Sequence, residues 1–205
     1  MYLPKRYESP SSAEIEEVVR DHPFATLITP RGVEAKISHV PLVLEKRGSE
    51  WVLIGHFARA NDHWKFLEGN EAIAIFHGPH AYVTPLWYEH CDVPTWNYVV
   101  AHLSGRPRLL EREEDTVAAL KALSARMEGE AGWKFEIPAD LAEPGVLMKS
   151  IVGFEIPVSA RAGKFKLSQN KSSTDIGGVM AGLATRKDDH SAGVLAWMRR
   201  LTKRE

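Results

Sequence analysis

The chain has 205 residues, of which 44% are hydrophobic and 26% charged, and its formal net charge at pH 7 is −1. This composition can fill an ordinary core, which excludes a disordered chain, and the length suits one domain with terminal additions. The near-neutral charge gives no overall attraction for nucleic acid, and no apolar run is long enough to span a membrane. The start of the chain has no apolar signal region, and Cys91, the single cysteine, excludes an internal disulfide. We therefore expect a cytoplasmic protein in which this thiol has no catalytic role.

The first part of the chain predicts a helix followed by three strands. Ser11 and Ser12 precede an amphipathic helix over residues 13–20, which Pro23 prevents from continuing. In the second strand Lys36 and Ser38 alternate with apolar residues, so both face the same side of the sheet. The predicted strands of this part are residues 24–29, 33–44 and 51–57.

Residues 55–64 read Gly-His-Phe-Ala-Arg-Ala-Asn-Asp-His-Trp and follow the third strand. They lead into a short helix expected over residues 62–67, with Asn61 as its N-cap. A helix N-terminus offers unpaired N–H groups and a partial positive charge, and His56 and Arg59 come just before it. The stretch therefore indicates a phosphate or carboxylate site. The alternative is an ordinary strand-to-helix turn with one solvated arginine.

The rest of the chain predicts more strands and then mainly helices. Gly78-Pro79 marks a bend between two strands, and Pro144 interrupts one helix. Five or six strands with short connections before residue 110 indicate an antiparallel barrel. The predicted strands are residues 71–76, 81–84, 99–110 and 151–158, with a short extended segment at 165–170. The predicted helices are residues 113–127, 138–149, 172–183 and 191–203.

Two further clusters could carry chemistry. The first is a dense group of aromatic residues, which either packs over a barrel end or covers a flat ligand or a partner chain. Its members are Tyr82, Trp87, Tyr88, Trp96 and Tyr98. The second supplies hydrogen-bond donors near the final strand, and its alternative is a solvated basic turn. Its members are Lys164, Lys166, Gln169 and Asn170.

Several common site patterns are missing from the sequence. The nine histidines form no His-Glu-x-x-His pattern, and there is no Cys-x-x-Cys pair, so we expect no metal site. The sequence also lacks a Walker-type loop, a Gly-x-Ser-x-Gly elbow and a dinucleotide fingerprint. We find no helix-turn-helix pattern, so direct DNA binding stays undecided.

Six motifs nevertheless occur in an order that resembles a known family. They are Met1-Tyr2-Leu3-Pro4, residues 55–61 (GHFARAN), 78–85 (GPHAYVTP), Trp87-Tyr88, 93–98 (VPTWNY) and 166–170 (KLSQN). Together they resemble the PaiB-type FMN-binding negative transcriptional regulators over residues 1–183. Two departures are Leu86, where serine is common, and Lys171-Ser172, where Arg-Pro is frequent.

This resemblance implies a fold, a cofactor and an assembly. The fold is mainly β with flanking helices (α+β), a six-stranded antiparallel split β-barrel of the FMN-binding type. It is similar to pyridoxamine-phosphate oxidases and flavin reductases. The implied protein is a homodimer that binds FMN at the dimer interface. Residues 1–183 would form the FMN-binding domain. The resemblance does not extend to residues 184–205, which the sequence itself predicts to be a helical tail.

The resemblance and the residue chemistry together give two sets of cofactor-binding residues. The FMN phosphate is expected to meet His56, Arg59 and Asn61, with Lys36 and Ser38 from the neighbouring strand. The flavin ring or the dimer contact is expected to involve Trp96, Asn97 and Tyr98, with donors from Lys166, Gln169 and Asn170. Two alternative functions are a flavin-dependent oxidoreductase acting on a small molecule and a haem-binding split-barrel protein.

Overall fold

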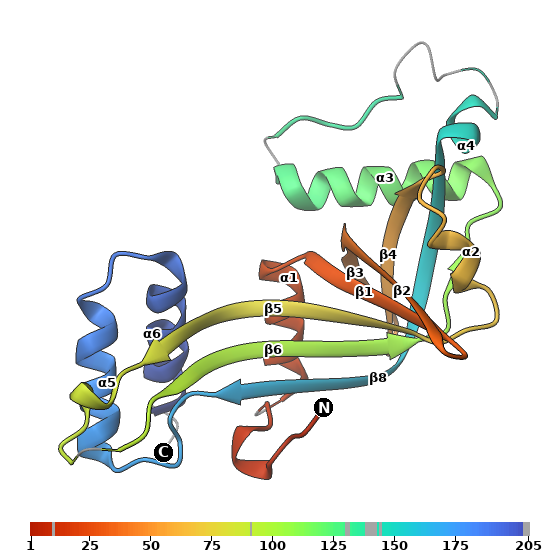
Figure 1. Ribbon diagram of the computed structural model, residues 1–205. Helices are drawn as coiled ribbons and strands as arrows, with labels where there is room; N and C mark the ends of the chain where they lie inside the picture. The colour runs from red at the N-terminus through yellow and green to blue at the C-terminus, as the bar shows by residue number, and fades with distance from the viewer. Residues whose placement is uncertain (10, 91, 130–131, 138–142, 144, 203–205) are drawn as a thin grey trace. The chain divides into compact units, whose positions relative to one another are not determined.

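The computed structural model describes residues 1–9, 11–90, 92–129, 132–137, 143 and 145–202 (Figure 1). The strands are β1 (Phe24–Arg31), β2 (Glu34–Pro41), β3 (Val43–Arg47), β4 (Glu50–Ala58), β5 (Ala72–Val83), β6 (Thr95–Gly105), β7 (Arg108–Leu109) and β8 (Ile151–Lys166). The helices are η1 (Lys5–Tyr7), α1 (Ser12–Asp21), α2 (Trp64–Leu67), η2 (Pro85–Trp87), α3 (Glu113–Glu128), α4 (Val146–Ser150), α5 (Ser173–Ala184) and α6 (Asp189–Thr202).

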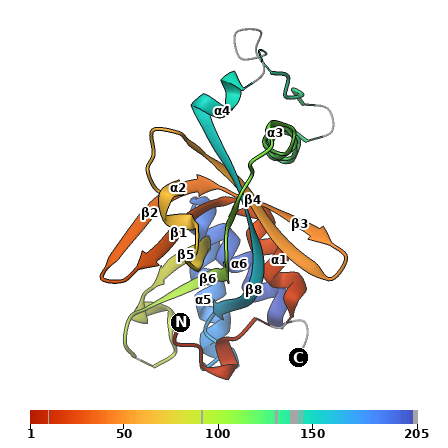
Figure 2. The same ribbon diagram turned by 90° about the vertical axis from the view of Figure 1, so that its right-hand side faces the viewer.

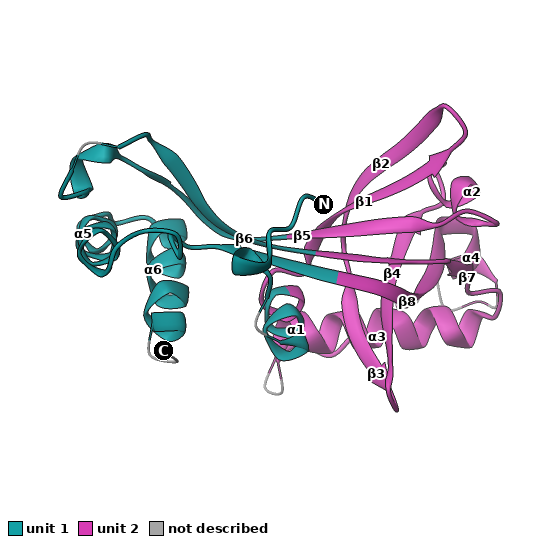
Figure 3. Cartoon of the chain, turned by 90° about the horizontal axis from the view of Figure 1, so that it is seen from below, with its two compact units in different colours: residues 1–18, 77–101, 162–205 teal, residues 19–76, 102–161 magenta. Residues whose placement is uncertain are grey.

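The chain divides into two compact units, coloured separately in Figure 3. Unit 1 comprises Met1–Val18, His77–Ala101 and Ala162–Glu205, and unit 2 comprises Val19–Phe76 and His102–Arg161. Strands β5, β6 and β8 contribute residues to both units. The division of the chain into residues 1–183 and a tail of 184–205 stays a prediction.

The strands follow the order β2-β1-β5-β6-β8-β4-β3, and β7 pairs with β8. The pairs β1–β2, β1–β5, β3–β4, β4–β8 and β7–β8 are all antiparallel. The expectation of a mainly antiparallel sheet with flanking helices is confirmed. The expected number of six strands was wrong, because the residues that the structure describes form eight.

Interrupted ladders explain the difference in strand number. The strand expected over residues 33–44 is two strands, because the Leu42 N–H donates to the Pro23 carbonyl at 2.9 Å. The strand expected over residues 99–110 likewise divides into β6 and β7, with Pro107, which has no N–H to donate, between them.

Strand β5 shows the opposite error, since two strands were expected where one continuous strand runs. Gly78 and Pro79 do not interrupt it. Instead, a Cβ added at Gly78 would lie 3.0 Å from the Val99 carbonyl oxygen and 3.1 Å from its Cβ. The glycine therefore allows β6 to approach β5 closely, rather than starting a turn.

In unit 2 the hairpins β1–β2 and β3–β4 lie on opposite sides of the central strands (Figure 2). Phe57 is fully buried and stacks on Phe154, with ring centroids 4.9 Å apart. Helix α3 contacts β4 and β3, and its Ala119 packs with Val52 and Ile54. These contacts give unit 2 its own hydrophobic core.

In unit 1 helices α5 and α6 pack on each other, and α5 packs on η2. A Cβ at Gly178 would lie 2.0 Å from the Trp87 carbonyl oxygen, and one at Gly182 would lie 2.2 Å from the Trp87 ring. These two glycines let α5 lie directly against η2. The helices expected at residues 13–20, 113–127, 172–183 and 191–203 are confirmed, with small shifts at their ends.

Some expectations concern residues outside the described ranges. Cys91 is one of them, and so are residues 138–142 and Pro144 of the expected helix 138–149, of which the structure shows α4. Within the described ranges, every helix is too short or too polar to cross a bilayer.

Candidate functional site

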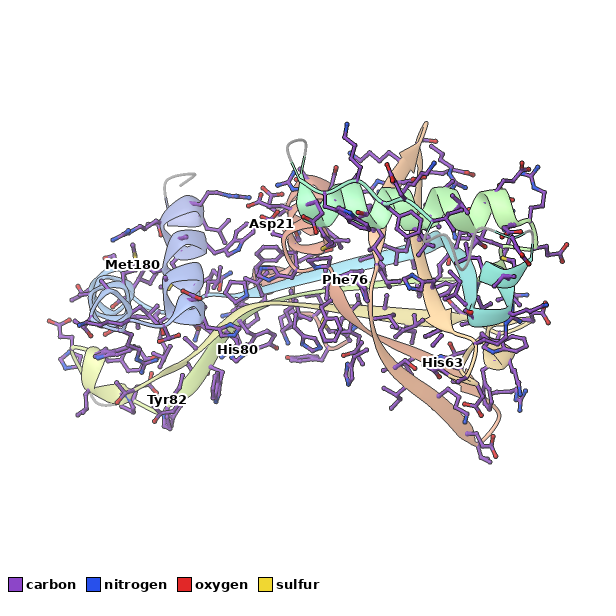
Figure 4. The ribbon with its side chains drawn as sticks, turned by 90° about the horizontal axis from the view of Figure 1, so that it is seen from above. Asp21, His63, Phe76, His80, Tyr82 and Met180 are labelled. Atoms are coloured by element: carbon purple, nitrogen blue, oxygen red, sulfur yellow. The ribbon has the colours of Figure 1, made fainter. Side chains whose placement is uncertain are left out.

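A polar cluster lies in unit 2 around His63, and we call Thr29, Ser38, Asn61 and His63 the His63 cluster. The His63 ring lies between two hydroxyls, with Nδ1 2.8 Å from Ser38 Oγ and Nε2 3.0 Å from Thr29 Oγ1. Asn61 Nδ2 donates to Ser38 Oγ at 3.2 Å, and the His63 backbone N–H donates to Asn61 Oδ1 at 3.1 Å. Figure 4 shows His63 beside the β1–β2 hairpin.

The strand register explains why these side chains meet. Ser38 pairs with Leu27 across β1 and β2, and Lys36 pairs with Thr29, so their side chains share one face of the hairpin. That face is buried at Leu27 and Thr29, both 0% exposed. The side chain of Phe57 stacks on the His63 ring at 5.0 Å, which fixes the ring between the hydroxyls.

Lys36 brings a positive charge next to this cluster. Its Nζ lies 3.0 Å and 3.1 Å from the two carboxylate oxygens of Asp62 and 5.1 Å from the Phe66 ring centroid. Burial, and then the nearby Lys36, lower the pKa of His63, while Asp62 opposes the shift. The imidazole is therefore neutral at pH 7, so one ring nitrogen donates a hydrogen bond and the other accepts.

Arg59 is held by main-chain carbonyls of the α4–β8 junction. Its Nη2 donates to Met148 O and to Ile151 O, at 2.5 Å and 3.1 Å. Its Cζ lies 5.2 Å from the Trp64 ring centroid, and the Trp64 indole donates to the Arg59 carbonyl at 3.1 Å. Its buried Nε has no partner among the described residues. Arg59 therefore braces the start of β8.

His56 lies on β4, opposite Gly153 of β8. Its side chain is half-buried, and burial lowers its pKa. No hydrogen bond among the described residues joins its side chain to the His63 cluster.

Helix α2 is shorter than the expected helix. It covers Trp64–Leu67, and His63, not Asn61, is its N-cap. Asn61 bonds the backbone within the preceding turn instead. Four residues cannot sum to a substantial helix dipole, so the anion argument here depends on side chains rather than on a helix N-terminus.

Asn97 lies in unit 1, in a second polar group. It is fully buried, and its Nδ2 donates to Ser168 Oγ at 2.8 Å and to Met198 Sδ at 3.7 Å. Ser168 donates back to Asn97 Oδ1 at 3.2 Å and has the left-handed backbone angle φ 68°. This pair locks β6 to the turn after β8.

Three other expected donors lie around the same turn. Lys166 Nζ donates to Thr95 Oγ1 and to Trp96 O, and the second distance is 2.7 Å. The side-chain amide of Gln169 bonds the backbone of Leu167 and Phe165, which shapes the turn itself. Asn170 is exposed.

Exposed aromatic rings gather in unit 1. Trp96 is 51% exposed, and its ring lies 6.2 Å from Tyr82 and 5.6 Å from His80. His80 lies 4.2 Å from His190, and Figure 4 labels His80 and Tyr82 along β5. Tyr98 is half-buried, with the Lys164 ammonium 5.5 Å from its ring. These rings offer a partly exposed aromatic surface, but they are inclined to one another rather than coplanar, with 69° between Tyr82 and Trp96.

The structure thus brings Lys36, Ser38 and Asn61 together in unit 2 and Asn97, Trp96 and Lys166 together in unit 1. Sequence reasoning missed Thr29 and assigned no role to His63. Thr29 lies two residues after Leu27 on β1, so strand alternation could have placed its hydroxyl on the same face as Leu27.

A cavity of about 410 Å³ lies elsewhere in unit 2, and none of the expected site residues lines it. Its charged groups are already paired, since Arg47 lies 2.6 Å from Glu155 and 3.3 Å from Glu45. We therefore do not assign the flavin to it. Its lining is Glu45, Arg47, Ile54, Leu110, Asp115, Ala118, Ala119 and Glu155.

Comparison with known proteins gives the family. Residues 1–160 match a family described as "Putative FMN-binding domain". The chain is also 31% identical to "Protease synthase and sporulation protein PAI 2" of Bacillus subtilis (strain 168), over 93% of each chain. The chain belongs to the PaiB-type FMN-binding family. FMN, or a related flavin, is the cofactor that this family implies.

Solved structures show that the PaiB-type chain has the split-barrel fold. A "FAD and Heme binding protein" from Mycobacterium smegmatis matches with a TM-score of 0.61 and 16% identity, over 83% of this chain and 79% of the other. "Flavocytochrome Anf3" from Azotobacter vinelandii matches with a TM-score of 0.60 and 12% identity, over 78% and 69%. At these identities the likeness concerns the fold alone.

Proposed function

We propose that this protein binds FMN through a phosphate site at Lys36, Ser38 and Asn61. The observation that carries the proposal is the meeting of an ammonium, a hydroxyl and an amide in unit 2. Lys36 and Ser38 stand two positions apart on β2, and they contact the adjacent residues Asp62 and Asn61. A phosphate dianion takes hydrogen bonds from this set of donors.

The neutral His63 ring fits this site. Ser38 Oγ accepts from Asn61, so its own hydrogen is available either to His63 Nδ1 or to a ligand. When Nδ1 carries the imidazole proton and donates to Ser38, the hydroxyl can donate to a phosphate oxygen. His63 thus orients Ser38 without adding charge, and Thr29 accepts or donates on the other side of the ring.

In this proposal Lys36, Ser38 and Asn61 are the main phosphate contacts, and Arg59 and His56 lie beside them. The buried Nε of Arg59 has no hydrogen-bond partner among the described residues, whereas its Nη2 donates to two main-chain carbonyls. His56 stands half-buried on β4. Once bound, FMN supplies one- and two-electron transfer. The assignment of the ring end or the dimer contact to residues 96–98, Lys166, Gln169 and Asn170 stays a prediction.

We also propose a homodimer, in which one face of strands β1, β2 and β5 in unit 2 is covered by a second copy of the chain. The register places Ile28 opposite both Ile37 and Ile73, so three isoleucines lie side by side. Ile37 is 61% exposed, and Phe24, on the same face, is 66% exposed. A monomer seldom leaves such an apolar sheet face in water, which supports a partner chain here.

We propose the regulatory role from the family resemblance, with the flavin as the sensed group. Whether the protein contacts DNA itself is a separate question, which a salt-dependent shift of promoter DNA by the pure protein answers. A cytoplasmic location also stays a prediction.

The visible spectrum of freshly purified protein tests the cofactor assignment. We expect flavin absorption, or its appearance with about one FMN bound per chain after FMN is added and excess removed. A Soret band would favour the haem alternative instead. Anaerobic reduction of bound flavin by NADH or NADPH, followed by turnover of an acceptor, would support the oxidoreductase. Protein that takes up neither flavin nor haem would contradict the proposal.

A further inference from the structure

Lys164 and Lys166 stand two positions apart on the part of β8 that belongs to unit 1, so they face the same side of the strand. Lys164 is only 8% exposed. Its Nζ donates to the Tyr2 carbonyl at 2.9 Å, and it lies 5.3 Å and 5.5 Å from the ring centroids of Tyr2 and Tyr98. The ammonium is therefore enclosed by one neutral acceptor and two aromatic rings.

Neither lysine is paired with a carboxylate among the described residues. Lys166 bonds only the Thr95 hydroxyl and the Trp96 carbonyl. Lys171, in contrast, is bonded to Asp92. A buried cation without a counter-charge is costly, because it loses hydration and gains only neutral partners.

The lowered pKa of Lys166 indicates a local excess of positive charge. Burial lowers its pKa most, and the charges of Lys164 and Lys171 lower it further. An anion bound between Lys164 and Lys166 would offset both effects.

We infer that the Lys164–Lys166 pair is a binding site for a small aromatic anion, whose phosphate or carboxylate group replaces the Tyr2 carbonyl on Lys164. Tyr98 lies beside the ammonium and provides a ring against which the aromatic part of the ligand packs. The anion also takes a hydrogen bond from Lys166, whose ammonium has a third donor besides its two present contacts. This inference does not rest on the flavin proposal.

The N-terminal segment covers this site and can leave it without unfolding unit 1. It is anchored to β8 by the Ser9 N–H, which donates to Gly163 O at 2.9 Å, and by a bridge between Glu8 and Lys164. Ahead of that anchor, Met1 and Tyr2 are 51% and 83% exposed. Displacement of the Tyr2 carbonyl therefore removes little buried contact.

The test is calorimetric titration of the purified full-length protein with phenyl phosphate and benzoate, with phenol as the neutral probe. We expect the two anions to bind and phenol to bind at least tenfold more weakly. Lys164→Met and Lys166→Met should each weaken anion binding about tenfold or more, as expected for loss of a charge-assisted contact. Lys187→Met, which removes an exposed lysine of the same unit, should leave it unchanged.

One further variant makes the result decisive. Deletion of residues 1–3 should tighten anion binding severalfold, because it removes the competing carbonyl, and weaker binding would contradict the proposed cover. Anion binding that survives Lys164→Met and Lys166→Met in folded protein would overturn the site. Lys166→Met keeps the test valid if the variant of the more buried Lys164 does not fold.

The same titrations in FMN-saturated protein separate this site from the flavin. We expect unchanged phenyl phosphate binding with FMN present, and unchanged FMN affinity in Lys164→Met. If FMN blocks phenyl phosphate and Lys164→Met weakens FMN but not riboflavin, the lysine pair holds the flavin phosphate. That outcome would overturn both the separate site and the assignment of the phosphate to Lys36.

Discussion

The ammonium of Lys36 lies 3.0 Å from a carboxylate oxygen of Asp62, at the edge of the His63 cluster. The ion pair is partly exposed, and the Lys36 hydrogen bond lowers the pKa of Asp62. A carboxylate here has two opposite effects. It holds Lys36 close to Ser38 and Asn61, and it competes with any phosphate for the same ammonium.

Asp62→Asn should therefore strengthen FMN binding. The substitution keeps the shape of the side chain and removes the negative charge next to the proposed phosphate. Since exposed ion pairs are weak, we expect FMN affinity to rise only about two- to fivefold. Fluorescence titration of FMN and riboflavin measures this, and riboflavin affinity should not change. Glu50→Gln, an exposed acidic residue of β4, is the control, and weaker FMN binding in Asp62→Asn would contradict our placement of the phosphate.

Arg59→Ala should mainly reduce stability. The guanidinium donates to two main-chain carbonyls at the start of β8, and charge-assisted hydrogen bonds contribute about 1.5–3 kcal/mol each. We expect the free energy of unfolding to fall by roughly 2–4 kcal/mol, measured by urea denaturation in the absence of flavin. Unchanged stability with greatly reduced FMN affinity would instead assign the whole guanidinium to the phosphate.

The His63 ring should titrate below the ordinary histidine pKa of about 6.5. Burial is the main cause and Lys36 adds to it. Because the folded pKa is lowered, the unfolded chain binds this proton first as the pH falls below about 6.5, so stability is full above that pH and declines below it. Histidine NMR resonances give the pKa, assigned with His63→Gln, and that variant should lose less stability between pH 7 and 5. A midpoint at or above 6.5 would mean that the imidazole is not buried between its hydroxyls.

Ile37→Asp should disrupt the proposed homodimer. A carboxylate in the middle of the exposed isoleucine face of β1, β2 and β5 would have to be desolvated on association. Light scattering after gel filtration should report the mass of one chain for this variant and of two for the unchanged protein. Val33→Asp is the matched control, because Val33 is fully exposed in the hairpin turn and should not affect the mass. A dimer that tolerates Ile37→Asp must use another surface.

The sequence predicted the helices and the antiparallel character of the sheet well, because both follow from side-chain periodicity. The strand count was wrong, because breaks depend on single hydrogen bonds such as Leu42 N–H to Pro23 O, which no periodicity reveals. The prediction that β5 is two strands separated at Gly78 was wrong for a similar reason. The role of this glycine depends on the close approach of Val99 from another strand.

In the candidate site, too, the sequence predicted which residues take part but not which contacts they make. Lys36, Ser38 and Asn61 were selected by residue chemistry, and the structure brings them together. The sequence could not show that Asp62 competes for Lys36, or that Arg59 and Gln169 bond main-chain groups. Those contacts join residues whose partners are set by the fold, and a local motif carries no information about them.

The most direct test of the central claim is the ratio of the dissociation constants of riboflavin and FMN, which reports the contribution of the phosphate alone. We predict that FMN binds more tightly than riboflavin to the unchanged protein. In Lys36→Met this ratio should fall about tenfold or more, as expected for the loss of one charge-assisted contact, while riboflavin affinity stays the same. A ratio that is equal in the two proteins would show that the flavin phosphate does not lie at Lys36.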